Sequence, residues 1–121
     1  MNNFSTKNRV DRYKQHLNSS QWKMLKREYW WSNRPNSCWA CDKKAPANFE
    51  GFNFHHRTYK NLFNETLDDV ILLCRHHHAD LEQWLIGLKP LGETVESWTP
   101  KYVKMVRDCL NLSNKKIARW I

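Results

Sequence analysis

Apolar residues recur at helical spacing near the N-terminus, and this pattern predicts two helices there. The first helix is short and covers residues 9–18. The second begins at Ser19 and Ser20, which are N-cap residue types, and the segment SNRPNS, residues 32–37, ends it. The apolar face of the second helix consists of Trp22, Leu25 and Tyr29.

The middle of the chain carries the pattern of two short strands followed by a helix. The segment FEGFNFHH, residues 49–56, alternates apolar and polar side chains as a strand does, and residues 57–68 are expected to form a loop. The segment over residues 69–74, which is apolar after Asp69, predicts a second, largely buried strand. From residue 75 to residue 85 the apolar spacing becomes helical, and Gly87 is expected to end that helix.

The C-terminal part of the chain predicts two further helices. Thr99 and Pro100 are a typical helix start, with threonine as the N-cap and proline at the first helical position. The apolar stripe of this helix consists of Tyr102, Val103, Val106, Cys109 and Leu110. Ser113 is expected to cap a last short helix that ends at Trp120 and Ile121.

These elements predict a small α+β protein, and 121 residues are enough for one domain with a modest core. We expect a helical lead-in over residues 1–34, a central region over residues 35–88 and a helical C-terminal extension over residues 89–121. The chain has only three glycines, which excludes a glycine-rich loop of the kind that holds phosphates.

The net charge of +8 favours an anionic partner. Basic residues outnumber acidic ones in residues 1–44 and 91–121, whereas acidic residues are in excess in residues 45–90. A locally acidic segment within a basic chain is the pattern expected when a metal site lies beside a polyanion. A soluble basic surface without a specific partner explains the charge equally well.

The chain is expected to be cytoplasmic, in a bacterial cell or a phage-infected host, with no membrane association. Its N-terminus, MNNFSTKNRVDR, has no apolar stretch of a secretory signal, and the longest apolar run, Val70–Cys74, is too short to cross a bilayer. In a reducing compartment, cysteines are more often metal ligands than disulfide partners.

Two short motifs predict a structural zinc site. Cys38 and Cys41 are separated by two residues, and so are Cys74 and His77. Two such pairs, each on a tight turn, can supply the four ligands of one tetrahedral zinc. The alternative is a set of buried or free thiol and imidazole groups. Cys109 lies outside this pattern and is expected to pack in the core.

The segment FHHRTYKNLFNETLDDVILLCRHHHADLE, residues 54–82, resembles the HNH endonuclease family, whose core is the ββα-metal fold. The resemblance extends from Tyr13 to Trp84 and includes the lead-in YKQHLNSSQWKMLKREYW, which is similar to phage-type members. Two positions depart from the family pattern. His77 stands where the family usually has a second cysteine, and Asp69 stands in place of the asparagine that gives the family its name.

The resemblance implies roles for five residues. His56 resembles the general base that accepts a proton from the attacking water. His55 and His78 resemble ligands of a single catalytic divalent cation, which could be Mg²⁺, Mn²⁺ or another transition metal. Glu82 is a further candidate ligand or partner of a ligand. Asp69 is expected to orient the His56 imidazole or the loop, or to bind the metal.

Elementary chemistry and geometry are consistent with these roles. Histidine, with an ordinary pKa of about 6.5, suits a base near neutrality, and a cation offsets the charge that develops on a phosphate. In a regular strand His55 and His56 point to opposite faces, so a twist or bulge is needed to aim both at one site. On the helix, the 100° rotation per residue places His77 toward the core, His78 beside Glu82 and His76 on an exposed polar face.

The resemblance implies metal-dependent hydrolysis of DNA, most simply double-stranded DNA, by a monomer or a homodimer. Arg57 and Arg75 are candidate phosphate clamps, although pairing with nearby acids is equally plausible. The other candidate DNA-binding residues are Lys23, Lys26, Arg27, Lys43 and Lys44. Trp39 is expected to be partly exposed and available to stack on a base.

Two other functions compete with the nuclease. One is a catalytically silent zinc module that binds nucleic acid. The other is an accessory protein of a phage packaging machine or a defence system, in which the C-terminal extension serves for docking.

Overall fold

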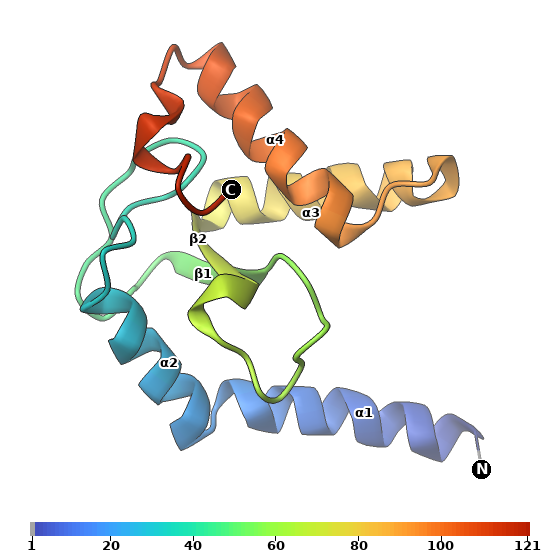
Figure 1. Ribbon diagram of the computed structural model, residues 1–121. Coiled ribbons are helices and arrows are strands. Elements are labelled where there is room, and N and C mark those ends of the chain that lie inside the picture. Colours follow the sequence, from blue (N-terminus) through green and yellow to red (C-terminus); the bar gives the residue numbers. More distant parts are fainter. Residues whose placement is uncertain (1) are drawn as a thin grey trace.

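The protein is described here by a computed structural model of residues 2–121, with side chains described from Val10 onward. It is a small α+β structure with four α-helices and a two-stranded antiparallel sheet. The elements are, in chain order, α1 (Asn2–Leu17), α2 (Ser20–Trp30), β1 (Phe52–His56), β2 (Val70–Cys74), α3 (Arg75–Leu88) and α4 (Val95–Cys109). In Figure 1 the sheet lies between α1 and α2 on one side and α3 and α4 on the other.

The two N-terminal helices meet at Ser19. Its hydroxyl oxygen accepts a hydrogen bond from the Trp22 amide at 3.2 Å, so the predicted N-cap of α2 is confirmed. The predicted apolar face is buried as well. The first helix is longer than residues 9–18, and its expected apolar residue Val10 is 50% exposed. The buried residue near the end of α1 is instead His16.

The sheet pairs β1 with β2 from Phe52 opposite Cys74 to His56 opposite Val70. The first strand was predicted to begin at Phe49 and begins three residues later. Phe49 and Gly51 have φ angles of 57° and 79°, in the left-handed region, and an extended strand cannot continue through them. β2 leads directly into α3, which gives the order strand, strand, helix (Figure 1).

Two predicted helix boundaries near the C-terminus are wrong. α3 passes through Gly87 and ends at Leu88. α4 begins four residues before Thr99, because Thr94 and Ser97 form a reciprocal capping box. Pro100 therefore lies inside α4, where it lacks one backbone donor.

The C-terminal extension is joined to the central region by a buried arginine. Arg107 of α4, 1% exposed, donates to the backbone carbonyl of Trp39 at 2.8 Å and to the carboxylate of Asp42 at 2.7 Å. Arg107 also donates to the other carboxylate oxygen of Asp42, at 3.3 Å, and to the carbonyl of Ser113. The Ser113 side chain accepts a hydrogen bond from the Lys115 amide, as expected for a cap. These bonds attach α4 and the residues after it to the turn that carries the first cysteine pair.

Two side chains are placed differently from the prediction. Trp39 is 1% exposed, and its indole N–H donates to the Tyr29 hydroxyl at 2.7 Å, so it is a core residue. Cys109 is exposed, because the buried face of α4 ends at Arg107. The most exposed tryptophan described is Trp31, at 84%.

Candidate metal centres

The first candidate centre consists of Cys38, Cys41, Cys74 and His77. One ligand atom of each lies within 4.8 Å of those of the other three. The first two cysteines lie on a tight turn, in which the Asp42 amide donates to the Cys38 carbonyl at 2.8 Å. Cys74 ends β2, and His77 lies in the first turn of α3. The fold therefore brings the two predicted motifs together.

The geometry of this cluster fits a tetrahedral metal ion. The sulfur atoms of Cys41 and Cys74 are 4.0 Å apart, and the Cys74 sulfur is 3.2 Å from Nδ1 of His77. Two thiolates bound to one zinc at about 2.3 Å each are about 3.8 Å apart at the tetrahedral angle. All four positions are filled by protein atoms, so this centre could hold a structural metal ion and leaves no position for a substrate.

The thiols of this cluster need a cation to become thiolates. Burial raises the pKa of Cys38 to about 12, and burial also raises the pKa of Cys41. Both groups are therefore neutral near pH 7 in the protein alone. A bound metal ion displaces the protons, so that binding of the ion and closure of this site are coupled.

The second candidate centre consists of His55, His78 and Glu82, whose ligand atoms also lie within 4.8 Å of one another. Nδ1 of His55 and Nε2 of His78 are each 3.4 Å from the same carboxylate oxygen of Glu82. The neighbouring imidazoles of His55 and His78 lower the pKa of Glu82 well below its ordinary value, so this group is a carboxylate at neutral pH. His55 is buried, whereas the side chains of His78 and Glu82 are 27% and 43% exposed. A cation bound here would have three protein ligands and an open side.

Thr99 of α4 fixes which nitrogen of His55 faces this centre. The Thr99 hydroxyl donates to the Val95 carbonyl at 2.6 Å, so its oxygen accepts from Nε2 of His55 at 2.9 Å. The lone pair of His55 is then on Nδ1, the atom that faces Glu82. Burial lowers the pKa of His55, which keeps the imidazole neutral, as a metal ligand must be.

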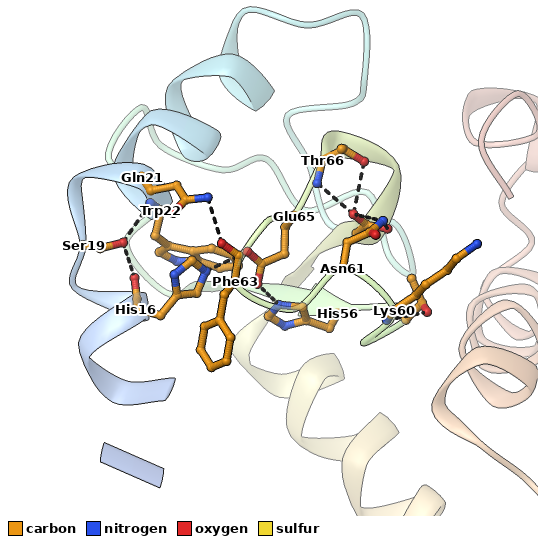
Figure 2. A network of polar contacts seen from close by, with 12 residues as sticks. His16, Ser19, Gln21, Trp22, His56, Lys60, Asn61, Phe63, Glu65 and Thr66 are labelled. Atoms are coloured by element: carbon orange, nitrogen blue, oxygen red, sulfur yellow. Dashed lines mark hydrogen bonds and ion pairs between the residues drawn. The ribbon is translucent and has the colours of Figure 1, made fainter. Parts of the chain in front are cut away.

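His56 lies on the opposite face of β1 and has a different environment (Figure 2). Its Nε2 is 2.8 Å from a carboxylate oxygen of Glu65, and both side chains are 2% exposed. The imidazole is stacked between the rings of Trp22, at 5.4 Å, and Tyr59, at 5.1 Å. The other oxygen of Glu65 is 2.7 Å from Nε2 of His16.

Glu65 was not singled out in the sequence and is the charged partner of His56. Burial raises its pKa, but hydrogen bonds from His56, from its own backbone amide and from His16 lower the pKa by more. The pKa of Glu65 therefore lies below its ordinary value, and the group is a carboxylate at neutral pH. A carboxylate accepts only, so Nε2 of His56 carries the hydrogen and Nδ1 has the lone pair.

Asp69 was expected to orient His56 or the loop, or to bind a metal. Its carboxylate accepts hydrogen bonds from the Thr66 amide at 2.8 Å, the Thr66 hydroxyl at 3.1 Å and the Asn61 amide group at 3.2 Å. Its partners Asn61 and Thr66, labelled in Figure 2, both belong to the segment between β1 and β2, and the hydrogen-bond partner of the His56 imidazole is Glu65. The contacts of Asp69 order the loop that carries Glu65.

One cavity of about 290 Å³ brings the second centre and His56 together. All five residues of β1 line it, so it runs along the edge of β1 that is not paired with β2. Because the cavity follows this edge, His55 and His56 both reach it from opposite faces of a regular strand, and the twist or bulge that was expected is not required. The cavity is also lined by His78 and Glu82 and by the basic side chain of Lys26.

The other candidate DNA-binding residues are dispersed. Arg57 is half-buried and donates to the Trp120 carbonyl, so its guanidinium is attached to the C-terminal segment and not to the cavity. Arg75 is exposed at the start of α3. Lys43 and Lys44 are exposed beside the first cysteine pair, whereas Lys23, Lys26 and Arg27 lie on α2. His76 is exposed, as predicted.

Comparisons with protein-family models, with curated proteins and with solved structures find no match for this chain. Over residues 2–121, none of the helices has the length and apolar character needed to cross a membrane.

Proposed function

We propose that this protein is a metal-dependent endonuclease of the HNH type that hydrolyses phosphodiester bonds in DNA. The observation that carries this proposal is the shared cavity, where a three-ligand cluster with an open side lies beside an imidazole. Phosphodiester hydrolysis needs both groups, a cation for the developing charge and a base for the attacking water. Lys26 adds a positive charge at the same cavity.

In this proposal His55, His78 and Glu82 hold the catalytic divalent cation. When bound, the cation offsets negative charge on the phosphate and on the departing 3′-oxygen. Two imidazoles and one carboxylate favour a transition metal such as Mn²⁺ or Zn²⁺ over Mg²⁺, which prefers oxygen ligands. The Cys₃His centre, by its sulfur ligands, is assigned to a structural Zn²⁺.

His56 is the proposed general base, and Glu65 is its positioning residue. With the Nε2 hydrogen donated to Glu65, Nδ1 of His56 can accept a proton from water. The carboxylate then stabilises the imidazolium that forms.

Replacing Glu65 with glutamine is expected to slow DNA cleavage by at least about 10-fold, since a group that orients a site residue contributes about that much. The amide keeps the size of the side chain but loses the charge, and its NH₂ can donate to His56. NMR of the imidazole nitrogens should show a mixture of tautomers in the variant and a single tautomer in the wild type. Glu50→Gln, at an exposed position outside the cavity, is the matched control. Unchanged tautomer and rate would remove Glu65 from the mechanism.

The proposal is tested by incubating plasmid DNA with the protein in Mg²⁺, Mn²⁺ or Zn²⁺. Wild type is expected to nick or linearise the plasmid, and His56→Ala to lose about 100-fold or more of the rate, the usual contribution of a general base. The exposed neighbour His76→Ala should cleave normally. Equal cleavage by His56→Ala and wild type would show that His56 is not the base.

A zinc-containing module that binds nucleic acid without cutting it is the second candidate function. The observation that favours it is the burial of His56, 3% exposed and enclosed between Trp22 and Tyr59. Such an imidazole can serve as a packing residue. DNA binding without metal-dependent cleavage in any of the three cations would favour this function over the nuclease.

A further inference from the structure

Trp31 is an exposed tryptophan that the fold does not explain. It follows α2 as the C-cap residue and is 84% exposed. Two other tryptophans near it, Trp30 and Trp120, have partners for their rings. Trp30 packs edge-on against Phe49, and the guanidinium of Arg34 lies 5.6 Å from the Trp120 ring. Among the side chains described, none forms an aromatic or cation–π pair with the Trp31 ring. Both faces of this indole are therefore open.

The surroundings of Trp31 are strongly basic. Trp31 lines two adjoining hollows, one along α2 and one toward the C-terminus. No acidic side chain lines either hollow in the part of the chain that is described, but the exposed carboxylate of Asp68 pairs with Arg34 at 2.5 Å. The basic side chains that line them are Lys23, Lys26, Arg27, Arg34 and Arg119. We call these residues together with Trp31 the Trp31 surface.

The Trp31 surface and the proposed catalytic cavity share one residue. Lys26 lines both that cavity and the hollow along α2. Trp31, at the end of α2, lines both that hollow and the hollow that Arg119 lines near the C-terminus. In Figure 1, α2 extends from its junction with α1 toward the sheet.

We infer that the Trp31 surface binds a single-stranded segment of the nucleic-acid substrate, with one base stacked on Trp31. This inference rests on the proposed function for its substrate. A basic groove that contains an exposed aromatic ring is the combination that single-strand-binding proteins use, since the cations follow the phosphates and the ring accepts any base. In a duplex the base faces are covered by their neighbours, so a duplex would use the lysines and arginines but not the indole.

Binding to a short fluorescein-labelled oligodeoxythymidine, measured by fluorescence anisotropy, tests the inference. The measurement uses the full chain carrying His78→Ala, so that cleavage does not consume the probe. Adding Trp31→Ala is expected to weaken binding by about 5- to 100-fold, the effect of losing one stacked base. The salt dependence should stay unchanged, because no phosphate contact is lost. Lys26→Gln should instead reduce the slope of log K against log salt by about 0.7.

Trp84→Ala is the matched control. Trp84 is the other exposed tryptophan among the described side chains, at 51%. It lies on α3 beside an apolar hollow. Its loss should leave binding of the oligonucleotide unchanged. A labelled duplex of the same length should lose little affinity with Trp31→Ala. An equal effect of Trp31→Ala on duplex and single strand, or no effect on either, would overturn the inference.

Cleavage by the protein with native His78 separates this inference from the proposed function. If the plasmid is cut but Trp31→Ala binds the oligonucleotide normally, the inference about the Trp31 surface is wrong and the proposed nuclease activity is supported. If Trp31 is needed for binding but no cation supports cleavage, the inference about the Trp31 surface is supported and the proposed nuclease activity is wrong. Displacement of the oligonucleotide by polyglutamate without any tryptophan dependence would indicate a non-specific polyanion surface and overturn the stacking.

Discussion

The variant His77→Ala is expected to lose its fold, whereas His76→Ala, one residue earlier, should fold normally. Nδ1 of His77 is 3.2 Å from the Cys74 sulfur and is the only nitrogen in the Cys₃His cluster. A structural zinc site contributes on the order of 10 kcal/mol in small zinc domains, and a domain of this size is stable by about 5–15 kcal/mol. Loss of one ligand is therefore enough to remove most of the stability.

The measurement combines thermal unfolding, followed by circular dichroism, with zinc analysis of the purified protein. Wild type and His76→Ala should contain one tightly bound zinc per chain and unfold cooperatively. His77→Ala should contain less zinc and show no cooperative transition, and a strong chelator should have the same effect on wild type. A folded His77→Ala protein that retains one zinc would show that this histidine is not a ligand.

The spacing of the cysteine and histidine residues made the first centre predictable. Two ligands separated by two residues fit one tight turn or one helical turn, and this local geometry does not depend on the rest of the fold. For the same reason the four-residue spacing of His78 and Glu82 placed both on one face of α3.

The parts that the sequence did not predict depend on long-range packing. Glu65 is nine residues from His56 in the chain and lies in a loop, where no periodicity indicates which side chain turns inward. Trp39 is buried and not partly exposed as expected, since Tyr29 and Arg107 of α4 contact it. The boundary of α4 was missed because the capping box of Thr94 and Ser97 begins the helix upstream of Thr99 and Pro100.

The variant His78→Ala is expected to remain folded and to lose most metal-dependent cleavage. In the proposed mechanism His78 holds a cation that contributes several kcal/mol to the transition state, so a loss of at least about 100-fold in rate is expected. The side chain of His78 is 27% exposed; it lies 3.4 Å from Glu82 and packs edge-on against the His55 ring at 5.4 Å. Its truncation leaves no large cavity, and the change in stability should lie within about 1 kcal/mol.

Three measurements on His78→Ala and on its control Gln83→Ala check this expectation. Gln83 is exposed on the same helix and belongs to neither cluster. Thermal unfolding and zinc content should match the wild type in both variants, while titration calorimetry should show weaker Mn²⁺ binding in His78→Ala alone. Cleavage at the wild-type rate by His78→Ala would exclude a catalytic cation at this cluster. Loss of zinc and of the fold would instead mean that His78, like His77, belongs to the structural site.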